Sequence, residues 1–294
     1  MMESASLPLK FKVPRAQATA ADLERAVGRV ELAIKHDGER HSIDDLHQSG
    51  CGRLLFPARA VQAPLEAVVV NTAGGLTGGD RFDVNIHLKS GSRAAITTQA
   101  CEKVYRTAST AARVTTKIRA DESATLHWLP QETILFDASS LERSLRIDMR
   151  ATADVLACES IILGRQAMGE VLSTAHLQDS WRIRRDGRLV FAEETAVKSD
   201  WASAFAAKAA LGPDTAALAT LVHVAPQYLT AHADKALEAV RGIMQYHNCD
   251  GGASVFDGLM VIRLLAPSGL SMRQVLTPLM EYCSGQRLPR VWTT

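Results

Sequence analysis

Apolar and polar residues alternate along most of the chain between Val30 and Val190. In the run from Phe82 to Leu88, for example, every second residue is apolar. A period of two is typical of β-strands that bury one face. Short turn sequences such as Asp37-Gly38 separate these runs. The pattern predicts a β-rich body of many short antiparallel strands, with hairpin turns at residues 37–38, 90–91, 120–123 and 186–187.

The last third of the chain has a different pattern. The alanine-rich segment 200–218 and the segment 226–244, which has apolar residues close to helical spacing, predict two helices. A strand is expected at 259–265. A final helix is expected at 271–283, with Ser271 as N-cap and Gly285 just past its end. No linker or repeat interrupts the chain, so we expect a single domain over residues 1–294; whether residues 1–20 are ordered stays open.

Four glycines fall within the six positions from Gly74 to Gly79, and Asp80 follows them. A phosphate-binding P-loop would need a lysine and a hydroxyl after its last glycine, and a dinucleotide site would need a helix there. A strand pattern follows instead. The segment therefore predicts a shaped loop between two strands rather than a nucleotide site.

Composition narrows the classes of partner. The net charge is +1, and charges of both signs are interspersed, so no long-range field attracts nucleic acid or a membrane surface. The five cysteines are scattered without a C-x-x-C pair, which indicates neither a disulfide framework nor a zinc ribbon. No apolar stretch has the length of a signal peptide or a membrane span. We expect a soluble cytoplasmic protein.

Common enzyme motifs are absent: the sequence contains neither G-x-S-x-G nor H-E-x-x-H. His36, His41 and His47 lie among acidic residues in a polar stretch, which favours a solvated surface over a metal site. His127 lies between two apolar residues and points to the opposite face, where a satisfied or exposed histidine is favoured over a ligand.

Several carboxylates lie in apolar or glycine-rich segments, where burial is costly unless the group is paired, hydrogen-bonded or bound to a cation. They are Asp80, Glu132, Asp137, Glu159 and Glu170. Buried pairing with an arginine such as Arg106 or Arg165 competes with a metal-binding role for each of them.

Five blocks of the sequence resemble the urease accessory protein D family, also called UreD or UreH. They are GGLTGGD (74–80), TTQACEKVYRT (97–107), WLPQETILFD (128–137), LGRQAMGE (163–170) and LPRVWTT (288–294). The blocks follow the order of the family and span about 220 residues. In the second block, Cys101 and Glu102 depart from the small or neutral residues expected there.

The resemblance implies a non-catalytic maturation factor for the nickel enzyme urease. Such a factor binds apo-urease and the accessory proteins F and G, of which G is the GTPase. It is expected to pass Ni²⁺ through an internal water-filled channel and to hold no cofactor tightly. The implied fold is mainly β, with stacked antiparallel and mixed sheets of β-helix-like or sandwich-like character and a few helices in the C-terminal third.

Carried onto this sequence, the resemblance gives candidate residues for two roles. Single carboxylates suit a transient Ni²⁺ path, because a closed set of thiolates or imidazoles would trap the ion. The candidates for this path are Asp80, Asp137 and Glu170, with Glu159 as a secondary candidate. The candidates for partner binding, or for internal neutralisation of these carboxylates, are Lys103, Tyr105, Arg106 and Arg165.

Two other functions remain open at this point. One is a metal-dependent hydrolase whose site uses His127, Asp137 and Glu170, which would bind its metal tightly. The other is a pure interaction protein that stabilises urease without contacting nickel, for which carboxylate substitutions would be silent.

Overall fold

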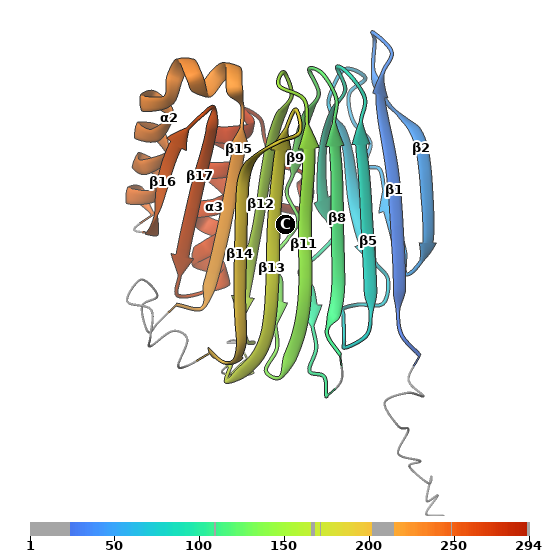
Figure 1. Cartoon of the computed structure of the whole chain (residues 1–294), viewed down its shortest axis with the longest axis vertical. Coiled ribbons are helices and arrows are strands. Elements are labelled where there is room, and N and C mark those ends of the chain that lie inside the picture. The colour runs from blue at the N-terminus through green and yellow to red at the C-terminus, as the bar shows by residue number, and fades with distance from the viewer. Residues whose placement is uncertain are drawn as a thin grey trace, which may run out of the picture.

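The computed structural model of the protein describes residues 24–108, 110–165, 168–170, 172–201, 215–247 and 249–292. Within them the chain forms a seven-stranded sheet stacked on a ten-stranded sheet (Figure 1). Residues 1–20, whose order was left open, lie outside the described residues.

The first sheet has the strand order β14-β13-β11-β8-β5-β1-β2. Its strands are β14 (Arg188–Asp200), β13 (Thr174–Arg185), β11 (Ser139–Met149), β8 (Ala112–Ala120), β5 (Arg81–Leu88), β1 (Val27–His36) and β2 (His41–Gly50). The second sheet has the order β16-β17-β15-β12-β9-β6-β4-β3. These strands are β16 (Asp250–Phe256), β17 (Leu259–Ala266), β15 (Ala217–Val224), β12 (Asp154–Leu163), β9 (Thr125–Trp128), β6 (Arg93–Thr98), β4 (Leu65–Asn71) and β3 (Gly52–Leu55). Two short strands, β10 (Thr133–Leu135) and β7 (Glu102–Val104), extend it beside β12.

Neighbouring strands in the middle of both sheets are parallel. The chain therefore crosses from one sheet to the other after each strand, from β5 to β6, from β8 to β9 and from β11 to β12. Successive coils stack on one another, which is a β-solenoid-like arrangement. The mainly β fold of stacked, mixed sheets is confirmed.

The pairing of the strands differs in part from the prediction. Hairpins form at Asp37-Gly38, between β1 and β2, and at Asp186-Gly187, between β13 and β14. The hairpins predicted at 90–91 and 120–123 are wrong, because β5 pairs with β8 and β6 pairs with β9. An alternating pattern fixes which face of a strand is buried but does not identify its neighbour, and a short polar turn serves a hairpin or a crossover equally well.

The helices predicted at 226–244 and 271–283 are confirmed as α2 (Pro226–Tyr246) and α3 (Gly269–Ser284). The N-cap of α3 is Ser268 rather than Ser271, and Gly285 ends the helix in the left-handed conformation, at φ 64°. The helix predicted at 200–218 is wrong at its C-terminal end, because Ala217 and Leu218 pair with both β12 and β17. Its residues 202–214 lie outside the described residues. None of the helices described is long and apolar enough to cross a membrane.

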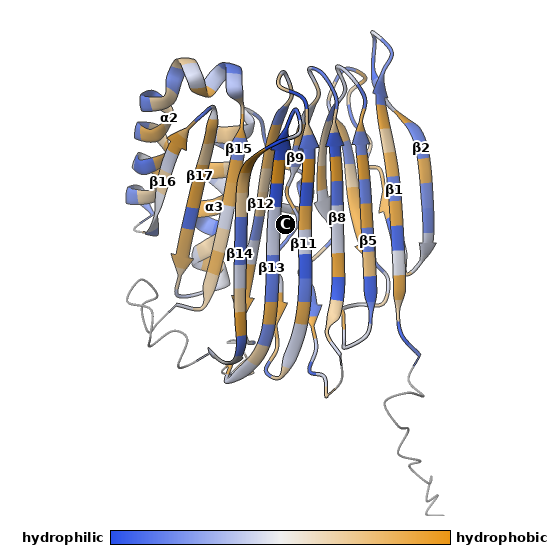
Figure 2. Cartoon of the chain, viewed as in Figure 1, coloured by the Kyte–Doolittle hydropathy of each residue, from blue (hydrophilic) through white to orange (hydrophobic). Residues whose placement is uncertain are grey.

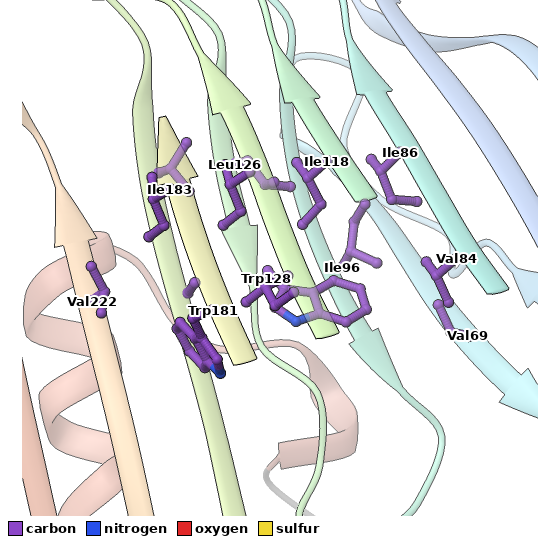
Figure 3. Packing of buried hydrophobic residues seen from close by; sticks show 14 of the residues in the cluster. Val69, Val84, Ile86, Ile96, Ile118, Leu126, Trp128, Trp181, Ile183 and Val222 are labelled. Atoms are coloured by element: carbon purple, nitrogen blue, oxygen red, sulfur yellow. The ribbon is translucent and has the colours of Figure 1, made fainter. Parts of the chain in front are cut away.

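The main core lies between the two sheets. Trp128 of the second sheet and Trp181 of the first project into it beside Leu126 and Ile118, as Figure 3 shows. Figure 2 shows the alternation of polar and apolar residues along the strands of the first sheet. In β11 the apolar positions are buried. A second core lies between the ten-stranded sheet and the helices. Each fully buried large aliphatic side chain contributes roughly 1.5–3 kcal/mol, so both cores hold the coils in register.

One expected surface residue is buried. His41 is 5% exposed, its ring stacks on His36 at 4.5 Å, and its Nδ1 accepts a hydrogen bond from the Arg93 amide at 3.1 Å. The prediction of a solvated histidine is therefore wrong at this position. Burial, with the charges of His36 and Arg93, lowers the pKa of His41 to about 4.

Candidate functional site

Four of the five sequence blocks lie side by side along one edge of the second sheet. Leu76 of the glycine-rich block forms a parallel bridge with Val104. Strand β7 pairs in parallel with β10, and β10 pairs in parallel with β12. The blocks are thus successive rungs of one ladder, because the solenoid places equivalent positions of successive coils next to each other.

The fifth block packs against the third. The Trp292 indole donates a hydrogen bond to the Leu129 carbonyl at 3.0 Å, and the Gln131 amide donates to the Val291 carbonyl at 3.1 Å. The described part of the C-terminal segment therefore closes over the same ladder.

The glycine-rich block is a loop between β4 and β5, as predicted, and its glycines have a structural reason. Gly75 has φ +146°, and a Cβ atom there would lie 2.4 Å from the ring of Tyr105. The Tyr105 hydroxyl donates to the Gly74 carbonyl at 3.1 Å. Asp80 closes the loop: its two oxygens accept the amides of Ala26, at 2.9 Å, and Thr77, at 2.8 Å.

We use the name motif face for the surface patch formed by the exposed side chains of Tyr105, Arg165 and Met168 around the buried ring of Phe136. The Tyr105 ring meets Phe136 edge-on at 5.1 Å, and the Arg165 guanidinium lies 4.4 Å from the centre of the Phe136 ring. Glu170 holds Arg165 through a 2.9 Å ion pair and an additional hydrogen bond to its Nε. These contacts present aromatic and arginine side chains in fixed orientations, with Met168 77% exposed beside them.

Two cavities lie between the sheets. The first, of about 330 Å³, lies against the glycine-rich block and β7, because its wall includes Gly74, Gly75 and Lys103. The second, of about 460 Å³, reaches the edge strand β14, and its wall includes Glu193 and Glu194. Arg143 and Glu159 belong to both walls. The two cavities are therefore neighbours, separated by this pair of side chains.

Arg143 lies in a buried ion cluster at this partition. It donates two hydrogen bonds to Asp179, at 3.1 and 2.6 Å, and one to the Thr133 hydroxyl at 3.2 Å. Its Nε also lies 3.3 Å from Oε2 of Glu159. Burial raises the pKa of Glu159, and the Arg143 charge opposes this shift. Oε1 of Glu159 accepts a hydrogen bond from Trp128 at 3.1 Å, whereas its buried Oε2 has no hydrogen-bond donor.

Other carboxylates lie in or beside the first cavity. Glu132 is buried and accepts from Arg273 at 3.0 and 2.9 Å; the Cys101 thiol donates to it at 3.3 Å. Although burial opposes the shift, Arg273 holds the pKa of Glu132 below its usual value. Glu102 contacts the neutral Asn71 amide at 3.3 Å, and burial raises the pKa of Glu102 to about 7.

Comparison with known proteins decides the family. The model of the UreD urease accessory protein family matches residues 26–293. The chain belongs to this family. It is similar to the urease accessory protein UreD of Rhizobium leguminosarum bv. viciae, at 43% identity over 270 residues that cover 92% of this chain and 96% of the relative. It is similar to that of Rhizobium etli at 42% identity over 276 residues, covering 94% and 98%. UreD of Chelativorans sp. is 40% identical over 277 residues, covering 94% and 97%.

Within this UreD-family chain, the four candidate nickel-path residues have different surroundings. Glu159 lines both cavities. Asp80 binds backbone amides, and so does Asp137, which accepts the amides of Ser173 and Thr174 at 2.9 and 2.8 Å. Glu170 is paired with Arg165, as the structural alternative predicted. Of the four, Glu159, the secondary candidate, is the one that lines the cavities.

Of the partner-binding candidates, Lys103, Tyr105, Arg106 and Arg165 are all exposed near the motif face. The set proposed for a hydrolase is not assembled. His127 is buried, and its Nδ1 lies 3.0 Å from the Gln286 amide, so it is a satisfied histidine. No group of three or more His, Cys, Asp or Glu within the described ranges is placed to hold a metal ion.

Two residues of the buried ion cluster, Arg143 and Asp179, were not among the predicted candidates, although the sequence contains a signal for them. Arg143 lies in register with Leu141 and Leu145, and Asp179 lies in register with Leu177 and Trp181. A charged residue at an inward position of an alternating strand indicates a buried ion pair. Glu102 had been noted only as a departure from the family pattern.

Proposed function

We propose that this protein is a non-catalytic urease maturation factor of the cytoplasm. It binds apo-urease and accessory proteins F and G, and it helps deliver Ni²⁺ to the urease active site through its internal cavities. The observation that carries the proposal is membership of the UreD family over residues 26–293. No tightly bound cofactor is required, since Ni²⁺ is the cargo.

The two cavities support a route for the cargo. Their walls carry Glu102 and Glu159, which are single carboxylates rather than a closed ligand set. A cation that moves through a protein needs oxygen ligands that replace part of its hydration shell and then release it. Carboxylates spaced along a wall meet this need, whereas clustered imidazoles and thiolates would retain Ni²⁺.

The motif face supports partner binding. Tyr105 and Arg165 are exposed, yet their orientations are fixed by Phe136, Gly74 and Glu170. Preorganised tyrosine and arginine side chains lose little conformational entropy on binding and are frequent hot spots. The first cavity lies close to this face, because Gly74, which lines it, accepts a hydrogen bond from the Tyr105 hydroxyl.

The test is urease activity after apo-urease, proteins F and G, GTP, bicarbonate and nickel are mixed with and without this protein. Activation is expected to depend on it. Equal activation without the protein, together with no binding to protein F or apo-urease, would refute the proposed function.

Carboxylate variants separate transport from scaffolding. Glu159→Gln is expected to lower activation several-fold while complex formation is retained, because glutamine keeps the shape but not the charge. Glu142→Gln is the matched control: it lies on the solvent side of β11 and pairs with Arg113 at 2.8 Å. If both variants activate urease as the wild type does, the protein acts as a pure interaction partner.

Partner binding is tested at the motif face. Tyr105→Ala and Arg165→Ala are each expected to weaken binding to protein F or apo-urease by roughly tenfold or more, as truncated hot spots do. Tyr246→Ala on α2 is the control, since Tyr246 is 85% exposed and lies outside the motif face. Titration calorimetry with each partner distinguishes which one uses this face.

A further inference from the structure

The partition between the two cavities is unusual because its central group is a cation. Arg143 extends from β11 of the first sheet, and Glu159 faces it from β12 of the second. Asp179 is the cross-strand neighbour of Arg143 on β13. The cluster therefore holds one guanidinium and two carboxyl groups. Arg143 and Glu159 both line the two cavities.

The two ion pairs of Arg143 are unequal. Asp179 accepts two hydrogen bonds from it, at 3.1 and 2.6 Å, in a fork geometry that fixes the guanidinium. Glu159 has a single 3.3 Å contact with Nε, and its Oε2 accepts no hydrogen bond. The contact between the sheets is therefore the weaker one, and Oε2 keeps a free lone pair at the junction of the cavities.

We propose that Arg143 acts as a resident counter-ion that prevents Glu159 and Asp179 from retaining a divalent cation at the partition. This inference rests on the proposed function, in which Ni²⁺ is the cargo. Arg143 is a positioning and charge-setting residue: it stays bound to Asp179, and its positive charge weakens the attraction of Glu159 for a passing ion.

Electrostatics supports this role. A guanidinium stays protonated at every physiological pH, so the positive charge is permanent. In the protein interior a unit charge within about 4 Å of a ligand changes ion binding by more than tenfold. Two facing carboxylates without Arg143 would form an anionic oxygen site suited to a divalent cation. With Arg143 in place, the site attracts the cation weakly and releases it.

The measurement is the Ni²⁺ affinity of the purified full-length protein by equilibrium dialysis. The variant Arg143→Met removes the guanidinium and leaves the carboxyl groups of Glu159 and Asp179 at the partition. It is expected to bind Ni²⁺ at least about tenfold more tightly than wild type. Adding Glu159→Gln to this variant should abolish the gain. Arg146→Met, on the same strand but the other face, should not change the affinity.

Equal affinity of the folded Arg143→Met variant and the wild type would overturn the inference, with folding checked by circular dichroism. Glu159→Gln alone tests it without altering Arg143. Because the guanidinium already weakens this carboxylate, the affinity should change by less than about threefold. A loss of tenfold would show that Glu159 holds Ni²⁺ despite Arg143, and would also overturn the inference.

Failure of the inference about Arg143 can be distinguished from failure of the proposed maturation function. If urease activation does not depend on the protein while the Arg143→Met variant gains Ni²⁺ affinity, nickel delivery fails and the role of Arg143 in weakening cation binding stands. If activation depends on the protein and the affinities are equal, the maturation function stands and the inference about Arg143 fails.

Discussion

Replacement of Arg273 by alanine offers a sharp test of how the C-terminal part of the chain is held to the strand ladder. Arg273, on α3, binds Glu132 through two hydrogen bonds and also contacts the Gln131 side chain. Its guanidinium lies 4.9 Å from the centre of the Trp292 ring. Alanine removes all of these contacts and leaves the Glu132 carboxylate buried without its cation.

The magnitude follows from burial. The Glu132 side chain is 3% exposed and that of Arg273 is 26% exposed. Removing one partner of a buried pair costs about 3–5 kcal/mol, and the partial exposure of Arg273 favours the lower end. Loss of the contact with Trp292 adds about 0.5–1 kcal/mol. We expect a loss of roughly 3–4 kcal/mol, which corresponds to a decrease in Tm of roughly 6–8 °C for a chain of this size.

The stability lost in Arg273→Ala should depend on pH. In the wild type the pKa of Glu132 is below its usual value, so the pair stabilises the fold above about pH 4.5, and this contribution disappears as the pH falls. Without Arg273, burial alone acts on Glu132 and raises its pKa. Protonation then relieves the buried charge at low pH. The difference between wild type and variant is therefore expected to be larger at pH 8 than at pH 5.

The assay is urea unfolding followed by circular dichroism at both pH values. Arg263→Ala is the matched control, because Arg263 also binds one carboxylate, Glu193, but its side chain is 59% exposed. Such an exposed pair contributes about 1 kcal/mol or less. Equal losses for the two variants, or an Arg273→Ala loss that does not change with pH, would refute the reasoning from burial.

Three further outcomes follow from single contacts. Gly75→Ala should destabilise the fold by about 2 kcal/mol more than Gly74→Ala in urea unfolding, because only the new Cβ at 75 meets the Tyr105 ring, whereas the space around 74 is open. Asp137→Ala leaves two backbone amides without their acceptor and should cost about 1–2 kcal/mol at pH 7. Hydrogen bonds from these amides lower the pKa of Asp137, so this cost should shrink as the pH falls toward 3. Burial lowers the pKa of His127 to about 4, so the unfolded chain binds a proton more readily between pH 6.5 and 4. The wild type should lose up to roughly 3 kcal/mol across this window, and thermal melts of His127→Gln should show a smaller loss.

The alternation of residues predicted the strands well because burial of one face is a local property. Residues 82–88 occupy β5, and their apolar positions face the core, as a period of two requires. The pairing of strands is not local. Short polar turns at 90–91 and 120–123 lead to the opposite sheet, and only the packing of successive coils selects parallel neighbours. The pairing was therefore predicted wrongly at these turns because it depends on information that a single strand does not contain.

The candidate site, like the fold, was predictable from the sequence only in part. The sequence blocks predicted residues that the fold brings together, because each block occupies the same position of a successive coil. The surroundings of each carboxylate were not predictable from its block. Asp80 binds the amide of Ala26, and Asp137 binds the amides of Ser173 and Thr174, all of which lie far away in sequence. Asp179 is separated from its partner Arg143 by 36 residues. Arg143 and Asp179 were nevertheless detectable as charges at inward positions of alternating strands.

The buried cluster of Arg143, Glu159 and Asp179 is difficult to explain by stability alone. Apolar side chains of similar volume are often as stabilising as a buried ion pair or more so, because they avoid the cost of removing charges from water. The surrounding core of Trp128 and Trp181 would accept such side chains. An oxygen of Glu159 also remains without a hydrogen-bond donor, so the cluster is not fully satisfied. Its position between two cavities is consistent with the role proposed above for Arg143, which is to weaken the binding of a cation at the partition.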